Sequence, residues 1–284
     1  MWKKIASLIV FQFSVFASQD FTEQQVIDYH EGTCNQEEDL ESYIAAGFFD
    51  EIQSILDVGC GDGQVTARLA KRFPHVSFVG CDISQAMIDF AAKKYPPSEY
   101  PNLTFIVKDA CHLDDLETFD RIISFSALHW ISDQKQALSS IYKVLKPQGK
   151  ALIRTTPKSS NNDFKAVSLK VIVSFKWVSH FLNFKSSSSF HSERDYRKIL
   201  TGIGFIIDHM EQKNRELVFA NRSELMPFLK AILTPLWHLP ASKHNDFLHD
   251  YYNQLVKHGN RDEKGEIRIH FDKIELLLSK PKIE

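Results

Sequence analysis

The run ILDVGCGDGQ, residues 55–64, joins a short apolar segment to a glycine-rich turn. Apart from Asp57, residues 55–58 are apolar and partly β-branched, which is typical of a buried parallel strand. Three glycines follow at alternate positions, namely Gly59, Gly61 and Gly63. Residues 65–73 then predict a helix. A strand, a glycine-rich turn and a helix bring backbone N–H groups and a helix N-terminus against a nucleotide, although a tight turn of this kind also occurs without a ligand.

The spacing of the glycines is G-x-G-x-G and not the dinucleotide-binding pattern G-x-G-x-x-G. Two carboxylate residues lie beside or among them. Asp57 precedes the glycines and Asp62 lies among them. Together they would repel a pyrophosphate, so the turn favours a ligand that carries positive charge.

Three further apolar segments lead into polar or aromatic residues. Residues 76–81 end at Asp82, which lies 23 residues after Gly59, where a ribose-binding carboxylate is expected. Residues 103–107 are followed by Asp109, a possible acceptor for an adenine amine, and a fourth segment leads into SALHW at 126–130. Ligands of open α/β folds bind at the carboxyl ends of the strands, so these residues predict one site.

These motifs resemble those of class I S-adenosylmethionine-dependent methyltransferases. The run DVGCGDG at 57–63 is similar to the first motif of that family, and residues 82–88 are similar to its ribose segment. Asp109-Ala110 is similar to the adenine segment. KPQG at 146–149 resembles the L-x-P-G-G turn, with Gln148 in place of the first glycine. The resemblance covers roughly residues 51–156.

The resemblance implies an α/β, Rossmann-like fold with S-adenosyl-L-methionine as the cofactor. We expect a mostly parallel seven-stranded sheet with helices on both faces and helical cap insertions, as the alternation of strands and helices also indicates. The implied cofactor-binding residues are Tyr29, Asp57, Gly59, Gly61, Gly63, Asp82, Ile83, Met87, Asp109 and Ala110.

Size and charge limit the classes of partner. A chain of 284 residues suits one large α/β domain with insertions. The net charge of −2 provides no basic field, so nucleic acid is not expected as a partner. The four cysteines form no C-x-x-C pair, which argues against a metal site and a disulfide framework. We expect a monomer or a weak dimer.

Residues 1–17 resemble a signal peptide, because Lys3 and Lys4 precede a largely apolar run that ends in a possible cleavage site at 15–17. The run is too short to span a bilayer comfortably, so no stable membrane insertion is expected. An extra N-terminal helix or an upstream start are the alternatives. Since the implied cofactor is made and used in the cytosol, we expect a cytoplasmic protein, with export as the alternative.

The remaining chain is predicted to add caps to this core. Residues 20–46 have a helical pattern, and an aromatic-rich insertion follows the fifth strand, either as a lid over a substrate or as packing. Two short strands, 205–210 and 216–220, and a final strand, 267–278, are expected to enclose a helical insertion. The expected units are a signal-like segment 1–17, an N-terminal cap 18–50, the cofactor-binding core 51–157, a lid insertion 158–200 and a C-terminal part 201–284.

Two segments outside the core narrow the reaction. SALHW at 126–130 resembles the corresponding segment of the trans-aconitate, juvenile hormone acid and malonyl-carrier-protein carboxyl methyltransferases. LTPLW at 233–237, with HDYY at 249–252, is similar to the first two groups. Tyr29 and Gln36 lie seven residues apart and would share one helix face, which in carboxyl-methylating relatives covers the cofactor. The resemblance therefore implies methylation of a carboxylate.

Methylation of a carboxylate requires few catalytic groups, and the residues near the predicted site could supply them. A methyl sulfonium is already a strong electrophile, so the enzyme acts mainly by orientation and desolvation. A carboxylic acid with a pKa of about 4 is ionised at neutral pH and needs no general base. His129 could donate a hydrogen bond to the carboxylate or steady it as a cation, Trp130 could form the wall of the pocket, and Gln36 could bind the second oxygen. A capping His and a core Trp are the alternatives.

Other functions remain open from the sequence alone. The acceptor is expected to be a small organic acid, but a carrier-protein-bound acyl group would use the same mechanism. A cofactor-binding protein without catalytic activity is a third alternative. Arg154 could hold a second acid group, although an exposed residue at the end of a strand is the expected role.

Overall fold

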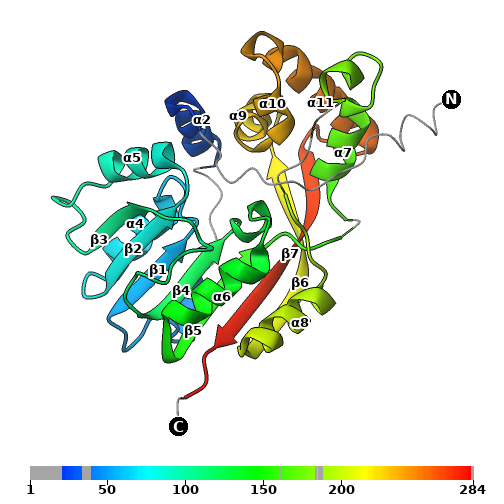
Figure 1. Ribbon diagram of the computed structural model, residues 1–284. Coiled ribbons are helices and arrows are strands. Elements are labelled where there is room, and N and C mark those ends of the chain that lie inside the picture. Colours follow the sequence, from blue (N-terminus) through cyan, green and yellow to red (C-terminus); the bar gives the residue numbers. More distant parts are fainter. Residues whose placement is uncertain (1–20, 34–39, 160, 183, 185–187, 283–284) are drawn as a thin grey trace.

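The computed structural model describes residues 21–33, 40–159, 161–182, 184 and 188–282, and these residues form a seven-stranded sheet flanked by helices (Figure 1). The strand order is β3-β2-β1-β4-β5-β7-β6. The strands are β1 (Ser54–Val58), β2 (Ser77–Asp82), β3 (Leu103–Val107), β4 (Phe119–Phe125), β5 (Leu145–Thr155), β6 (Ile206–Phe219) and β7 (Ile267–Ser279). Only β7 runs antiparallel to its neighbours, β5 and β6, so the predicted mostly parallel α/β sheet is confirmed.

Side-chain caps explain where many of the helices begin. Ser84, Asp133, Asn162, Ser192 and Asn221 each accept a hydrogen bond from a backbone N–H of the first turn. The described helices are α2 (Glu23–Thr33), α3 (Glu41–Ala45), α4 (Gln64–Arg72), α5 (Gln85–Lys94), α6 (Gln134–Val144), α7 (Asp163–Ile172), α8 (Glu193–Ile203), α9 (Arg222–Ile232), α10 (Thr234–His238) and α11 (His244–His258). Short 3₁₀ turns occur at Leu128–Trp130, Val178–His180 and Ala241–Lys243.

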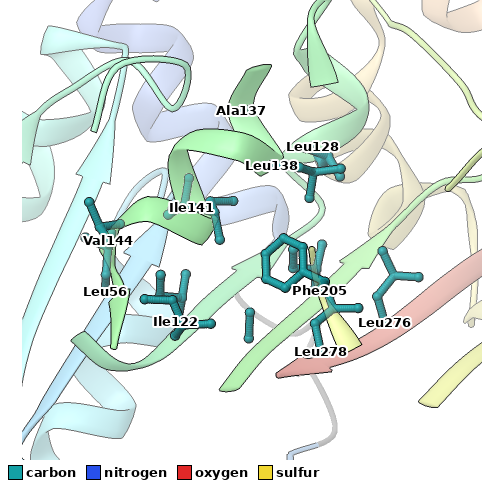
Figure 2. Close-up of a cluster of buried hydrophobic side chains, with 14 of the residues drawn as sticks. Leu56, Ile122, Leu128, Ala137, Leu138, Ile141, Val144, Phe205, Leu276 and Leu278 are labelled. Atoms are coloured by element: carbon teal, nitrogen blue, oxygen red, sulfur yellow. The ribbon is translucent and has the colours of Figure 1, made fainter. Parts of the chain in front are cut away.

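Successive strand residues point to opposite faces of the sheet, so each strand contributes to two apolar clusters. Ile122 packs with residues of α6 and α8, whereas its neighbour Ile123 packs with residues of α4. Figure 2 shows Ile141 of α6 over Ile122 of β4, with Leu276 of β7 beside Phe205 in the same cluster. Helices therefore cover both faces, as predicted, and both faces of the central strands are buried.

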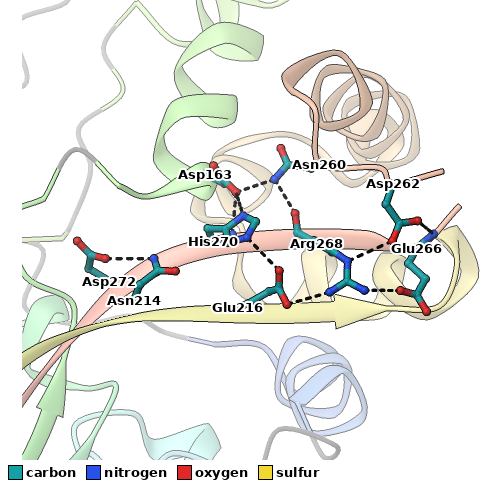
Figure 3. A network of polar contacts seen from close by, with 9 residues as sticks. All are labelled: Asp163, Asn214, Glu216, Asn260, Asp262, Glu266, Arg268, His270 and Asp272. Atoms are coloured by element: carbon teal, nitrogen blue, oxygen red, sulfur yellow. Dashed lines mark hydrogen bonds and ion pairs between the residues drawn. The ribbon is translucent and has the colours of Figure 1, made fainter. Parts of the chain in front are cut away.

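Strands β6 and β7 extend past the parallel sheet as a two-stranded arm. Residues 274–279 of β7 pair with both β5 and β6, while residues 267–273 pair with no strand other than β6. The sequence predicted two short strands at 205–210 and 216–220, but β6 is one continuous strand. The polar residues between the predicted strands stay in the ladder because they bond across it. Asp272, for example, accepts hydrogen bonds from Gln212 and from Asn214, the second of which Figure 3 shows.

A third apolar cluster lies on the arm. Helices α7, α9, α10 and α11 pack there against Phe219, Ile267 and Ile269, and Figure 1 shows these helices gathered at the far end of β6 and β7. Most aromatic residues of the predicted lid insertion contribute to packing. Trp177 and Phe181 are buried in this cluster, whereas Phe175 is 91% exposed. No helix in the described part of the chain is long and apolar enough to cross a membrane. The predictions for residues 1–17 lie outside the described residues.

Candidate active site

A cavity of about 1180 Å³ opens at the carboxyl ends of the parallel strands. It continues below α2 and between α9, α10, α7 and the β6–β7 arm. The strand order reverses between β1 and β4, which is where ligands bind in doubly wound sheets. Because a pocket for one small ligand measures roughly 300–1,000 Å³, this cavity has room for two ligands side by side.

The glycine turn forms the floor of one end of this cavity. Gly59 has a φ of 74°, and a Cβ added there would lie 2.3 Å from the Cβ of Ala127. The Asp82 carboxylate accepts hydrogen bonds from the backbone N–H of Gly61 at 3.1 Å and of Ser84 at 2.9 Å. Burial raises the pKa of Asp82, and these backbone donors oppose that rise. Asp82 therefore ties the end of β2 to the turn after β1.

Most of the predicted nucleotide-binding residues line the same end. The structure brings together Tyr29, Gly59, Gly61, Asp82, Ile83, Met87, Asp109 and Ala110 around the cavity. The Asp109 carboxylate is oriented by the backbone N–H of Cys111, which donates to it at 2.8 Å.

Asp57 and Gly63 lie below this surface and do not line the cavity. Asp57 is 3% exposed and accepts a hydrogen bond from the Thr66 hydroxyl at 2.6 Å. Burial, with a smaller effect of the Asp82 charge, raises the pKa of Asp57 to about 7. The expectation that two carboxylates face the ligand is therefore wrong for Asp57, since its side chain is directed from β1 to Thr66 of α4. Asp62 does line the cavity.

Helix α2 connects the two ends of the cavity from above. His30 Nδ1 lies 2.7 Å from the Asp62 carboxylate of the glycine turn, and Lys230 of α9 lies 2.6 Å from Asp28. Gly32 permits the close approach of α9, because a Cβ there would lie 2.6 Å from the Pro227 carbonyl oxygen. The predicted helix over the site is thus present at Tyr29. Gln36 lies outside the described residues.

His129 and Trp130 stand where the two ends of the cavity meet. They belong to the 3₁₀ turn Leu128–Trp130 after β4, and both line the cavity. His129 Nδ1 lies 3.2 Å from the Thr155 hydroxyl, and the Phe190 ring stacks on the imidazole with centroids 6.2 Å apart. Burial, reinforced by the charge of Lys273, lowers the pKa of His129 to about 3. Without ligands the imidazole is therefore neutral at physiological pH, which argues against the expected cationic role.

The far end of the cavity is apolar with a few cationic groups. Its walls include Phe164, Leu217, Phe228, Trp237 and Phe271. The cationic side chains at this end are Lys165, Arg215 and Lys273. Lys273 comes from β7, and its charge acts on the imidazole of His129. Sequence reasoning missed this lysine, because nothing near it in the chain points to a site.

Arg154 has neither of its predicted roles. It is 3% exposed, does not line the cavity, and its Nε lies 2.6 Å from the Glu275 carboxylate on the neighbouring strand β7. The rings of Tyr43 and Phe125 flank its guanidinium. Arg154 therefore joins β5 to β7 inside the protein.

Comparison with known proteins agrees with this geometry. Residues 55–149 match the family described as methyltransferase domain. The chain is a methyltransferase.

Similar proteins cover most of the methyltransferase. Juvenile hormone acid O-methyltransferase of Drosophila melanogaster is 28% identical over 231 residues, which are 74% of this chain and 75% of the relative. Malonyl-[acyl-carrier protein] O-methyltransferase of Priestia megaterium is 25% identical over 80% of this chain and 82% of its own length. The solved structure of Haemonchus contortus phosphoethanolamine N-methyltransferase 2 with S-adenosyl-L-methionine has a TM-score of 0.59 at 19% identity, over 93% of this chain and 58% of that chain.

The family match ends within β5 and includes only one end of the cavity. Helices α7, α9 and α10 and strands β6 and β7, which line the apolar end, all follow residue 149. The methyltransferase therefore combines a cofactor end typical of its family with a second end that its own C-terminal half builds.

Proposed function

We propose that this methyltransferase transfers the methyl group of S-adenosyl-L-methionine to a carboxylate oxygen of a small organic acid. The products are a methyl ester and S-adenosylhomocysteine. In the reaction a carboxylate lone pair forms the new O–CH₃ bond, and the electrons of the broken S–CH₃ bond remain on sulfur. The juvenile hormone acid and malonyl-carrier-protein O-methyltransferases support a carboxylate as acceptor.

The donor would occupy the end of the cavity formed by the glycine turn. Asp82 receives the ribose hydroxyls, and Asp109 with Ala110 receives the adenine, while Ile83 and Met87 pack on its ring. Tyr29 and the backbone of Gly59 and Gly61 border the methionine part, with Asp57 and Gly63 supporting the turn from below. Asp62, held by His30, supplies negative charge near this cationic ligand.

The acceptor would lie beside His129 and Trp130 in the apolar end. Lys273 lines the cavity, and its positive charge helps to lower the pKa of His129. We therefore assign Lys273 the role of binding the acceptor carboxylate. A neutral His129 and Trp130 form the wall that keeps the acceptor in line with the sulfonium. No proton has to be removed, since a carboxylic acid is ionised at neutral pH.

The walls favour an acid with a large apolar body. Phe164, Leu217, Phe228, Trp237 and Phe271 would remain in contact with water beside a small polyacid, but would be covered by a hydrocarbon chain or ring. We place the reaction in the cytoplasm, because the donor is made there.

One observation carries the proposal. A single cavity joins the strand ends that suit the nucleotide to an apolar chamber that Lys273 also lines. The test is to incubate the purified protein with S-adenosyl-L-methionine labelled in the methyl group and a panel of acids. The panel contains fatty and isoprenoid acids, aconitate and malonyl carrier protein.

We expect label in an ester that alkali hydrolyses to labelled methanol, with apolar monocarboxylic acids as the best substrates. Replacing His129 or Trp130 by Ala should lower turnover on the order of 10²-fold, because a misplaced acceptor costs about that much, while cofactor affinity changes little. A product that resists alkali, or no product from any acid, would contradict the proposal.

A further inference from the structure

Three buried polar side chains form a line behind His129. Thr155 of β5, Tyr196 of α8 and Gln134 of α6 are each at most 1% exposed. The Thr155 hydroxyl lies 3.2 Å from His129 Nδ1 and is hydrogen-bonded to the hydroxyl of Tyr196. Tyr196 in turn donates to Gln134 Oε1 at 2.7 Å. Because a buried polar group without a partner is costly, the hydrogens of this line must be arranged so that each group is satisfied.

The backbone at Ser189 fixes the direction of every hydrogen bond in the line. Gln134 Nε2 donates to the Ser189 carbonyl oxygen at 2.8 Å. A carbonyl oxygen only accepts, so the amide nitrogen must face it, and Oε1 must face Tyr196. The Tyr196 hydroxyl therefore donates to Gln134, and its oxygen is left to accept from Thr155. Once Thr155 donates to Tyr196, its own oxygen is left to accept from His129.

We infer that Gln134, Tyr196 and Thr155 hold His129 in the tautomer that carries its proton on Nδ1, with the lone pair of Nε2 directed to the cavity. The three residues are positioning residues, since they act through the imidazole and do not touch the ligands.

The charge near the imidazole agrees with this tautomer. Lys273 lines the cavity, and its positive charge acts on His129. A lone pair that faces an ammonium group is attracted to it, whereas an N–H group in the same place would be repelled. The Ser189 backbone N–H also donates to the His129 carbonyl oxygen at 2.8 Å. Ser189, whose carbonyl oxygen fixes the direction of these hydrogen bonds, thus also holds the backbone of His129 through its own N–H group.

The tautomer changes the role of His129 in the proposed function, on which this step rests. An Nε2 lone pair cannot donate a hydrogen bond to the acceptor carboxylate and would repel it. The carboxylate must then be held by Lys273, while His129 orients the ammonium group of that lysine and excludes water. The line of buried residues therefore decides which side chain binds the acid.

The test reads the tautomer directly by NMR of the imidazole ¹⁵N and ¹³Cδ2 nuclei in full-length protein labelled at histidine. The chain has twelve histidines, and the signal of His129 is identified by its loss in His129→Gln. Tyr196→Phe removes the acceptor for the Thr155 hydrogen, which can then turn to His129 Nδ1. Thr155→Ser keeps the hydroxyl group. Tyr142→Phe removes a tyrosine hydroxyl from α6 that lies against Gly204, away from the cavity, and is the matched control.

We expect the proton on Nδ1 in the wild type, Thr155→Ser and Tyr142→Phe, and on Nε2 in Tyr196→Phe. The cofactor dissociation constant from calorimetry should stay within about twofold in all of them. For Tyr196→Phe, kcat/KM for the acid should fall on the order of tenfold, as for the loss of one hydrogen bond. A wild-type proton on Nε2, or an unchanged tautomer in a folded Tyr196→Phe protein, would overturn the inference. An Nδ1 proton in a protein that methylates no acid would instead refute the proposed function and leave this inference standing.

Discussion

Asp57 is a buried carboxyl group whose ionisation should be visible in the stability of the protein. It is 3% exposed and accepts a hydrogen bond from the Thr66 hydroxyl, and burial raises its pKa from the ordinary 3.8 to about 7. The variant Asp57→Asn keeps the shape of the side chain and an oxygen that can accept from the Thr66 hydroxyl. It cannot ionise, so it isolates the effect of the charge.

The sign of the effect follows from the raised pKa. The folded protein holds the proton of Asp57 more tightly than the unfolded chain does, so this group contributes stability that is fully present below pH 3.8. That stability is lost as the pH rises through about 7. At about 1.36 kcal/mol for each pH unit, the whole interval corresponds to roughly 4 kcal/mol, of which about 2.6 kcal/mol falls between pH 5 and pH 8. Relative to Asp57→Asn, the wild type should therefore lose about 2.6 kcal/mol of unfolding free energy over that range.

The measurement is urea denaturation of both proteins at pH 5, 6.5 and 8 without cofactor, with equal m-values as the condition for comparing free energies. Glu263→Gln, at an exposed turn, is the control and should show no such trend. Saturating S-adenosyl-L-methionine should reduce the trend, because its positive charges favour an ionised Asp57. A difference between wild type and Asp57→Asn that does not vary with pH, or that varies in the opposite direction, would refute the reasoning.

Three further substitutions test the cavity from different sides. Gly59→Ala puts a methyl group 2.3 Å from the Cβ of Ala127 at a φ of 74°. The variant should lose about 1–3 kcal/mol of unfolding free energy and bind the cofactor more weakly, and a urea midpoint equal to that of the wild type would contradict this. His30→Ala removes the partner of Asp62, and calorimetry should show cofactor affinity reduced roughly tenfold with little change in thermal midpoint. Lys273→Met should raise KM for the acid roughly tenfold to 100-fold, whereas Lys273→Arg retains most affinity; equal KM values in wild type and Lys273→Met would exclude the assigned role.

The cofactor end of the cavity could be predicted because its residues are close in the sequence. The carboxyl ends of successive parallel strands lie at the same edge of the sheet. Asp82 and Asp109, which follow two such strands, could therefore be located from their spacing. The same reasoning failed at Asp57. The motif does not specify the contacts of each side chain of β1, and Asp57 is directed to Thr66 of α4 instead of to the cavity.

The acceptor end could not be predicted in the same way, because it is assembled from residues far apart in the chain. Lys273 reaches His129 through the antiparallel pairing of β7 with β5, which no local pattern indicates. Arg154 looked like a strand-end residue, yet that pairing buries it against Glu275. The polar middle of β6 resembled a loop because the partners that keep it in the ladder, such as Asp272, lie on the other strand.

Strand β7 belongs both to the sheet and to the wall of the acceptor chamber. Its residues 274–279 pair with β5, and its residues 267–273 extend beyond β5 with β6 and contribute Phe271 and Lys273 to the wall of the acceptor chamber. The position of Lys273 relative to His129 is therefore fixed by the same register that places Thr155 opposite Ile274. A shift of that register by one residue would turn Lys273 to the other face and separate the carboxylate site from the methyl donor. The buried Arg154–Glu275 pair lies on these two strands and would be lost in the same shift, so it resists that change. In this methyltransferase the choice of acceptor thus depends on the pairing of two strands, while the methyl donor depends on a local motif.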